Sequence, residues 1–122
     1  MLQEFVRTHA CMVYDKETDL EVTPEQARAV LEMAQKVDVV IAMSFFFRGN
    51  PTNAELIREL IKHGKKVIQV SACPYDNTCV SEAPTLLVTF SAMPRSLEVA
   101  ANIIYGKAAP GGTWPLKDYQ LS

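Results

Sequence analysis

Short continuous apolar runs alternate with amphipathic stretches along this chain. The runs lie at residues 10–14, 37–44, 66–71 and 85–91, and polar positions hardly interrupt them. Runs of this kind are typical of strands that are buried on both faces, as in a parallel sheet. The pattern therefore predicts four strands that lie side by side in the same direction.

The amphipathic stretches predict three helices. Thr23 suits the N-cap of the first, Pro24 its first position, and Gln26 can complete a capping box. The apolar positions that follow share one helical face: Ala27, Val30, Leu31 and Ala34. The other helices are expected at 53–63 and 94–105. Gly64 stops the first of these as a left-handed C-terminal residue, and the second is expected to end at Gly106.

Alternating strands and helices predict one α/β domain over residues 1–122. We expect a three-layer sandwich with a mostly parallel sheet, helices on both faces and right-handed crossovers. Ligands of such sheets meet the loops that leave the carboxyl ends of the strands. Those loops are expected to begin at Phe45, Ala72 and Ser91.

Composition narrows the classes of partner. The 122 residues are 48% hydrophobic and 21% charged with a net charge of −2, which is typical of a folded domain without an affinity for nucleic acid or an anionic membrane. The apolar runs are too short to cross a membrane, and the first residues lack the pattern of a signal peptide. Three cysteines, an odd number, favour a reducing compartment such as the cytoplasm.

The expected loop at 45–52 carries three phenylalanines and Arg48. Its rings, Phe45 and Phe46 among them, are candidates for stacking on a sugar or contacting a partner, although they can also cap the sheet. Arg48 can bind an anionic group, but a solvated or carboxylate-paired arginine is the commoner case. Gly49 stands alone, so no phosphate-binding pattern is present.

The expected loop at 72–82 holds Cys73 and Cys79, whose spacing fits neither a redox pair nor a zinc site. Two buried cysteines flanking a turn is the favoured interpretation, in which Asp76 accepts backbone hydrogens. A redox role would need a low pKa at Cys73. We expect no metal and no cofactor.

No residues form a self-sufficient catalytic group. Ser44, Ser71 and Ser91 end strands without a nucleophile elbow, and His63 is expected at the surface near the end of a helix. Glycoside chemistry needs two carboxylates that flank a bond. The candidates are all expected to be solvated: Glu55, Glu59 and Glu82.

Residues 37–116 nevertheless resemble the C-terminal α/β sandwich domain of glycoside hydrolase family three, in its β-N-acetylhexosaminidase branch. The similar segments are the strand at 36–41, the helix–strand unit at 55–68, Cys73-Pro74-Tyr75-Asp76, Val88-Thr89-Phe90-Ser91, 96–106 and the exit at 110–116. In the exit, Thr113-Trp114-Pro115 stands where the family has Gly-Lys-Leu-Pro.

The resemblance implies a supporting role. In this family the nucleophile lies in an N-terminal catalytic barrel that this chain lacks, and no glutamate stands at 45–52 to act as acid/base, so no catalytic residue is transferred. The first strand–helix unit of the family domain is also missing, which implies a fragment or a shortened form of a larger domain. Self-association would be one way to cover sheet surface exposed by that loss.

We therefore expect a non-catalytic domain that packs on the barrel and shapes the rim of a cleft for N-acetylglucosaminides. Its expected contacts with substrate or barrel are Phe45, Phe46, Arg48, Asn50, Tyr75 and Asp76. The isolated chain should be inactive. The alternative is a free-standing α/β interaction module without enzymatic activity.

Overall fold

The computed structural model describes residues 23–47, 50–72 and 79–113, with the backbone alone at 45–47 and 50–52. The strand expected at 10–14 and the exit beyond residue 113 lie outside these ranges. The elements in chain order are α2 (Pro24–Ala34), β1 (Val39–Phe47), β2 (Asn50–Thr52), α3 (Ala54–Lys62), β3 (Lys66–Ser71), β4 (Thr85–Val88) and α4 (Pro94–Ile104).

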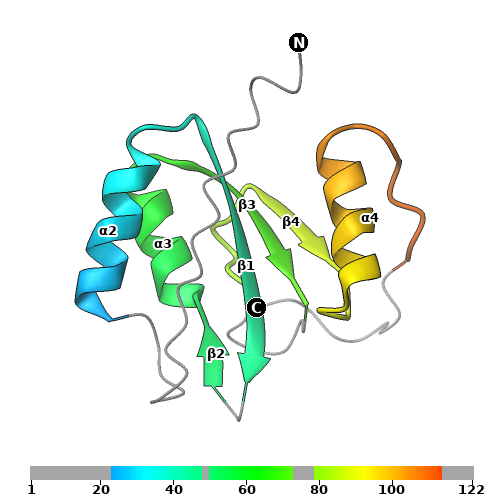
Figure 1. The fold of residues 1–122 in the computed structure, drawn as a ribbon, viewed down its shortest axis with the longest axis horizontal. Helices are drawn as coiled ribbons and strands as arrows, with labels where there is room; N and C mark the ends of the chain where they lie inside the picture. Colours follow the sequence, from blue (N-terminus) through cyan, green and yellow to red (C-terminus); the bar gives the residue numbers. More distant parts are fainter. Residues whose placement is uncertain (1–22, 48–49, 73–78, 114–122) are drawn as a thin grey trace.

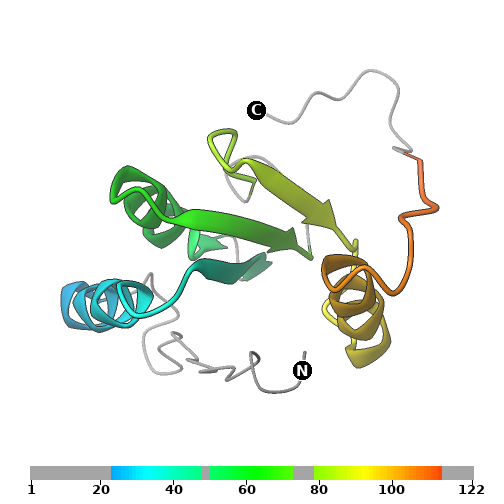
Figure 2. The same ribbon diagram turned by 90° about the horizontal axis from the view of Figure 1, so that it is seen from above.

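The sheet has the strand order β2-β1-β3-β4. Strands β1, β3 and β4 are parallel, and the pairing of β1 with β3 ends where Ser44 lies opposite Ser71. Helices α2 and α3 lie together on one side of the sheet, and α4 lies on the opposite side, beside β4 (Figures 1 and 2). The expected α/β sandwich with a mostly parallel sheet is confirmed.

The helix boundaries follow from local chemistry. The Gln26 amide donates to Thr23 Oγ1 at 3.2 Å while the Thr23 amide donates to Gln26 Oε1 at 2.9 Å, so the capping box at the start of α2 is confirmed. Gly64 and Gly106 follow α3 and α4 with φ of 77° and 69°, which is the left-handed conformation expected of Gly64.

The core lies between β1 and β3 on one side and α2 and α3 on the other. Its buried side chains come from both helices, from β3 and from the chain that precedes β4: Ala34, Ala54, Leu56, Ile57, Leu60, Val67 and Val80. Val40 and Ala42 of β1 pack against this cluster. Because side chains alternate along a strand, Val39 and Ile41 lie on the other face of the sheet.

Two sequence-based predictions need correction. The expected loop at 45–52 is a hairpin, since β1 continues to Phe47 and pairs with β2 in antiparallel fashion. Consecutive phenylalanines favour the extended conformation, and Pro51 is tolerated because β2 is an edge strand. Burial of β1 on both faces is also wrong: Val39 and Ile41 are 44% and 46% exposed.

Smaller differences concern the ends of two strands. Strand β1 begins at Val39 rather than at residue 37, and β4 ends at Val88 because Phe90 has a φ of 56°, which no strand accommodates.

None of the helices in the described ranges has the length and apolarity that a membrane span requires.

Candidate functional site

The candidate site is the carboxyl edge of the parallel sheet, where β1, β3 and β4 end beside one another. Their arrowheads point toward the same side in Figure 1, and the first turn of α4 lies there too. In open α/β sheets this edge is the usual place for a ligand.

A buried side chain, Gln69, connects the strand ends to the chain between β3 and β4. Its Nε2 donates to Ser44 Oγ at 2.7 Å, and its Oε1 accepts the Val80 amide at 2.9 Å. Gln69 and Ser44 are both fully buried. The Ser44 hydroxyl is therefore used inside the sheet and is not presented to a substrate.

The turn that follows β4 is fixed by two hydroxyl groups. The Thr89 amide donates to the Ser71 carbonyl at 2.9 Å, and Thr89 Oγ1 donates to the Ser91 carbonyl at 2.7 Å. Ser91 Oγ in turn accepts the Met93 amide at 3.1 Å, just before α4 begins. These contacts set the direction in which the chain leaves the sheet and enters α4.

Two residues other than glycine have a positive φ in the described ranges, and both lie at this edge. Asn53 (φ 65°) precedes α3, and its Nδ2 donates to the Met43 carbonyl at 2.9 Å instead of capping the helix. Phe90 (φ 56°) is 52% exposed, and Met93, three residues later, is 66% exposed. A left-handed phenylalanine is unusual, because only Gly, Asn and Asp adopt that conformation readily.

Two buried polar atoms at this edge have no hydrogen-bond partner among the described residues: Asn53 Oδ1 and Ser71 Oγ. Ser71 is fully buried, as is Ser44. A serine nucleophile needs an accessible hydroxyl and an adjacent base. Neither serine meets that requirement in the described part of the chain, where the edge offers hydroxyl and amide groups together with exposed apolar side chains.

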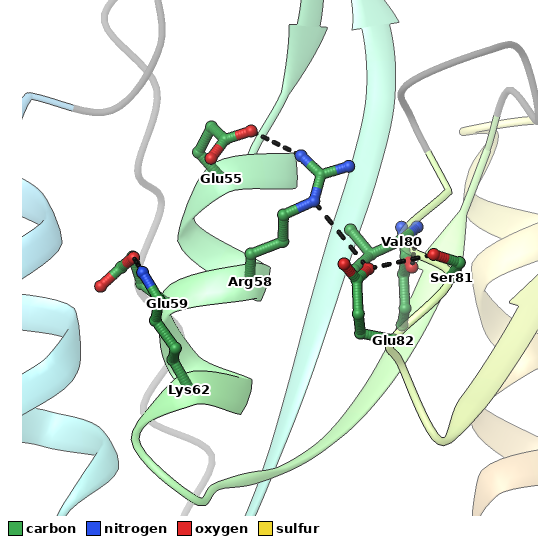
Figure 3. A network of polar contacts seen from close by, with 8 residues as sticks. Glu55, Arg58, Glu59, Lys62, Val80, Ser81 and Glu82 are labelled. Carbon is green, nitrogen blue, oxygen red and sulfur yellow. Dashed lines mark hydrogen bonds and ion pairs between the residues drawn. The ribbon is translucent and has the colours of Figure 1, made fainter. Parts of the chain in front are cut away.

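Charged residues gather instead on α3 and the chain before β4. Arg58 lies between Glu55 on its own helix and Glu82, whose carboxylate is 3.9 Å from Arg58 Nε (Figure 3). Ser81 Oγ also donates to Glu82, at 3.2 Å. This group ties α3 to the crossover between β3 and β4, but Glu55 and Glu82 are 66% and 55% exposed, so it contributes little to stability.

A second ion pair lies one turn further along α3. Lys62 Nζ donates to Glu59 Oε1 at 2.9 Å (Figure 3). This hydrogen bond, reinforced by the charge of Lys62, lowers the pKa of Glu59, and the same contact raises the pKa of Lys62. A carboxylate with a lowered pKa stays ionised and does not serve as a general acid near neutral pH.

The residues predicted for contacts are only partly placed. Phe45 and Phe46 lie in β1 opposite Thr52 and Pro51, and Asn50 in β2 lies opposite Phe47. The hairpin thus brings Phe45, Phe46 and Asn50 together along the backbone. The other three, Arg48, Tyr75 and Asp76, lie outside the described residues, as does Cys73.

Two further sequence-based assignments, a buried Cys79 and a His63 at the surface, agree with the structure. Cys79 is buried and its thiol is free. His63 is exposed just after α3, with Nδ1 2.8 Å from the Glu59 carbonyl oxygen. In the described part of the chain, no three residues of the types His, Cys, Asp and Glu come together in a way that could hold a metal ion.

Sequence analysis missed Gln69, Asn53 and Phe90. A glutamine within an apolar strand is a usable indication of a buried polar contact, because such a strand has no solvated face for it. Asn53 also has a usable indication, since asparagine tolerates positive φ before a helix. No pattern in the sequence indicates the backbone conformation of Phe90, because phenylalanine rarely adopts a positive φ.

Comparison of the chain with protein-family models, with curated protein sequences and with solved structures gives no match.

Proposed function

We propose that this chain is a non-catalytic α/β domain of a glycosidase resembling the family-three β-N-acetylhexosaminidases. In that role it packs on the catalytic barrel and shapes the rim of a cleft for N-acetylglucosaminides. The comparisons with known proteins give no relative of this chain. The proposal therefore rests on the order and spacing of the segments between residues 37 and 116 that resemble this family. An α/β sandwich is compatible with it.

The structural observation that supports packing on a catalytic barrel is the exposure of Phe90 and Met93. These large apolar residues are three positions apart where β4 leads into α4, and more than half of each is exposed. Exposed apolar side chains at a single edge are typical of a contact surface. They lie at the same edge of the sheet as the hairpin between β1 and β2.

The first experiment asks whether DNA immediately upstream of the Met1 codon encodes a catalytic barrel. If it does, barrel and chain produced together should elute as one complex from a sizing column. Phe90→Asn should weaken that complex, because asparagine tolerates the left-handed conformation while removing the ring. Tyr105→Ser is the matched control: Tyr105 is 44% exposed but lies at the far end of α4, so its loss should leave the complex intact.

A free-standing interaction module is the second candidate. The exposed apolar surface of β1, at Val39 and Ile41, favours it. An upstream region without a barrel, or a barrel that elutes separately from the chain, would support this candidate over the first.

A further inference from the structure

The face of the sheet that carries α4 is only partly covered by the described helices. Helices α2 and α3 lie together on the other face, whereas α4 lies beside β4 (Figure 2). Over β1 this face is accessible, since Val39 and Ile41 are 44% and 46% exposed, while Val70 of β3 is only 5% exposed. Parallel sheets are normally covered by helices on both faces. The part of this face over β1 is therefore a candidate docking surface.

Three residues define this surface, which we call the β1 strip: Val39, Ile41 and Lys66. Val39 lies opposite Lys66 in the pairing of β1 with β3, and Ile41 lies opposite Ile68. Val67 belongs to the core that β3 shares with α3. Because side chains alternate along a strand, Lys66 points to the opposite face, together with Val39 and Ile41. Lys66 is exposed, so the strip combines two aliphatic side chains with a positive charge.

A second positive charge lies at the same end of the sheet. Helix α4 follows the carboxyl end of β4 and runs back along the sheet, so it ends on the side where β3 and β4 begin (Figure 1). Lys107 comes just after that end of α4 and is exposed. Lysines beside an apolar surface favour a partner that brings acidic side chains to the contact.

The width of the uncovered region matches one helix. Strand β3 alone separates β1 from β4. Neighbouring strands lie about 4.8 Å apart, so β1 lies roughly 9.6 Å from β4, and packed helices have axes about 8–10 Å apart. A helix over β1 would therefore pack on the strip and beside α4 at the same time. The stretch 39–44 spans about 20 Å, the length of a helix of about 13 residues.

We propose that the β1 strip binds an amphipathic helix of a protein partner. Its aliphatic side chains contact Val39 and Ile41, and its acidic side chains lie beside Lys66. Aliphatic anchors at positions i, i+3, i+4 and i+7 of such a helix form one stripe along the strand. The strip is separate from the edge that carries Phe90 and Met93. The inference therefore goes beyond the proposed function and holds for both candidate functions.

A second copy of the chain is a poorer occupant of the strip. In a two-fold contact the same surface meets itself, so the contact would contain two copies of Lys66 and no opposite charge from the strip. Like charges across an interface are unfavourable. An acidic helix supplies the opposite charge and avoids this repulsion.

The test is a magnetic resonance titration of the isotope-labelled full chain with a designed peptide. The peptide forms a helix of about 14 residues with leucine at the four anchor positions and glutamate at most others. We expect saturable shifts of the amide signals of Val39, Ile41 and Lys66. A peptide with lysine in place of glutamate should bind at least about fivefold more weakly, because its charge matches that of the strip. Equal binding of the two peptides, or shifts confined to other parts of the chain, would overturn the proposal.

Substitutions in the chain separate the apolar contribution from the charge. Ile41→Thr keeps a β-branched residue but removes apolar surface, and it should weaken binding of the acidic peptide by about tenfold. Lys66→Gln should weaken it by about twofold to fivefold, whereas Asp38→Asn, which removes a nearby negative charge, should not weaken it. Met93→Ser, at the other edge of the sheet, is the control and should bind normally. Unchanged affinity in Ile41→Thr and Lys66→Gln, or an equal loss in Met93→Ser, would contradict the proposal.

Two other occupants of the strip would give different results. If another segment of this chain covered it, the free protein would show cross-peaks from Val39 and Ile41 to that segment, and the peptide would not shift their signals. If a second copy covered it, sedimentation of the free chain would show a dimer that Ile41→Thr dissociates. Either result would overturn the proposal.

Discussion

At the scale of single residues, buried polar groups hold the carboxyl edge together. Gln69 makes one contact to β1 through Ser44 and one to the crossover through Val80, and all three residues are at most 1% exposed. A buried polar group that loses its partner retains the full cost of leaving water. The sequence alone indicated a strand at this position but not which polar residue would organise it.

Gln69→Leu should lower the free energy of unfolding by roughly 2–4 kcal/mol, because the Ser44 hydroxyl and the Val80 amide both lose this partner. Urea titration followed by circular dichroism measures the change. Adding Ser44→Ala to the variant should restore part of the loss by removing one of the stranded groups. If the two side chains did not interact, Ser44→Ala would lower the free energy of unfolding by the same amount with and without Gln69→Leu. That result would contradict the contact between Gln69 and Ser44.

At the scale of elements, local sequence determined the helices well and the strand ends poorly. The capping box of Thr23 and Gln26 and the glycine after α3 act within a few residues, so their effect is visible in the sequence. The hairpin depends on pairing between β1 and β2, and the end of β4 depends on the unusual conformation of Phe90. Such features are fixed by tertiary contacts and backbone strain, which residue patterns do not encode.

Gly64→Ala tests the left-handed end of α3. A Cβ there would meet no atom within 4 Å, so the cost is due to backbone conformation alone, and we expect a loss of about 1 kcal/mol in urea titration. Gly111→Ala is the matched control, since Gly111 has equally open surroundings without a positive φ. Similar stability of the two variants would contradict the assigned role of Gly64.

Lys62→Met tests the ion pair on α3. Without the Lys62 donor the pKa of Glu59 should rise toward its ordinary value, which carbon-detected magnetic resonance of the carboxyl group can follow. The pKa is lowered in the folded state, so the pair stabilises the fold above the unfolded pKa, and this contribution disappears as pH falls through the folded pKa. Lys65→Met, which removes a nearby charge outside the pair, should leave the titration of Glu59 unchanged.

At the scale of the whole molecule, the periodicity of the sequence was sufficient to predict the layered α/β arrangement. It was not sufficient for the candidate site. Three of the six predicted contact residues lie outside the described part of the chain, and the exposed pair Phe90 and Met93 was not foreseen because exposure depends on how α4 joins the sheet. The exposed face of β1 likewise reflects which elements cover the sheet, a property of the assembled fold.

The most direct test of the central claim, that this domain supports but does not perform catalysis, is hydrolysis of a chromogenic N-acetylglucosaminide by the purified chain. The account predicts product release at the level of buffer alone. Turnover that increases in proportion to the amount of chain, and that a single carboxylate change such as Glu55→Gln or Glu82→Gln abolishes, would contradict it.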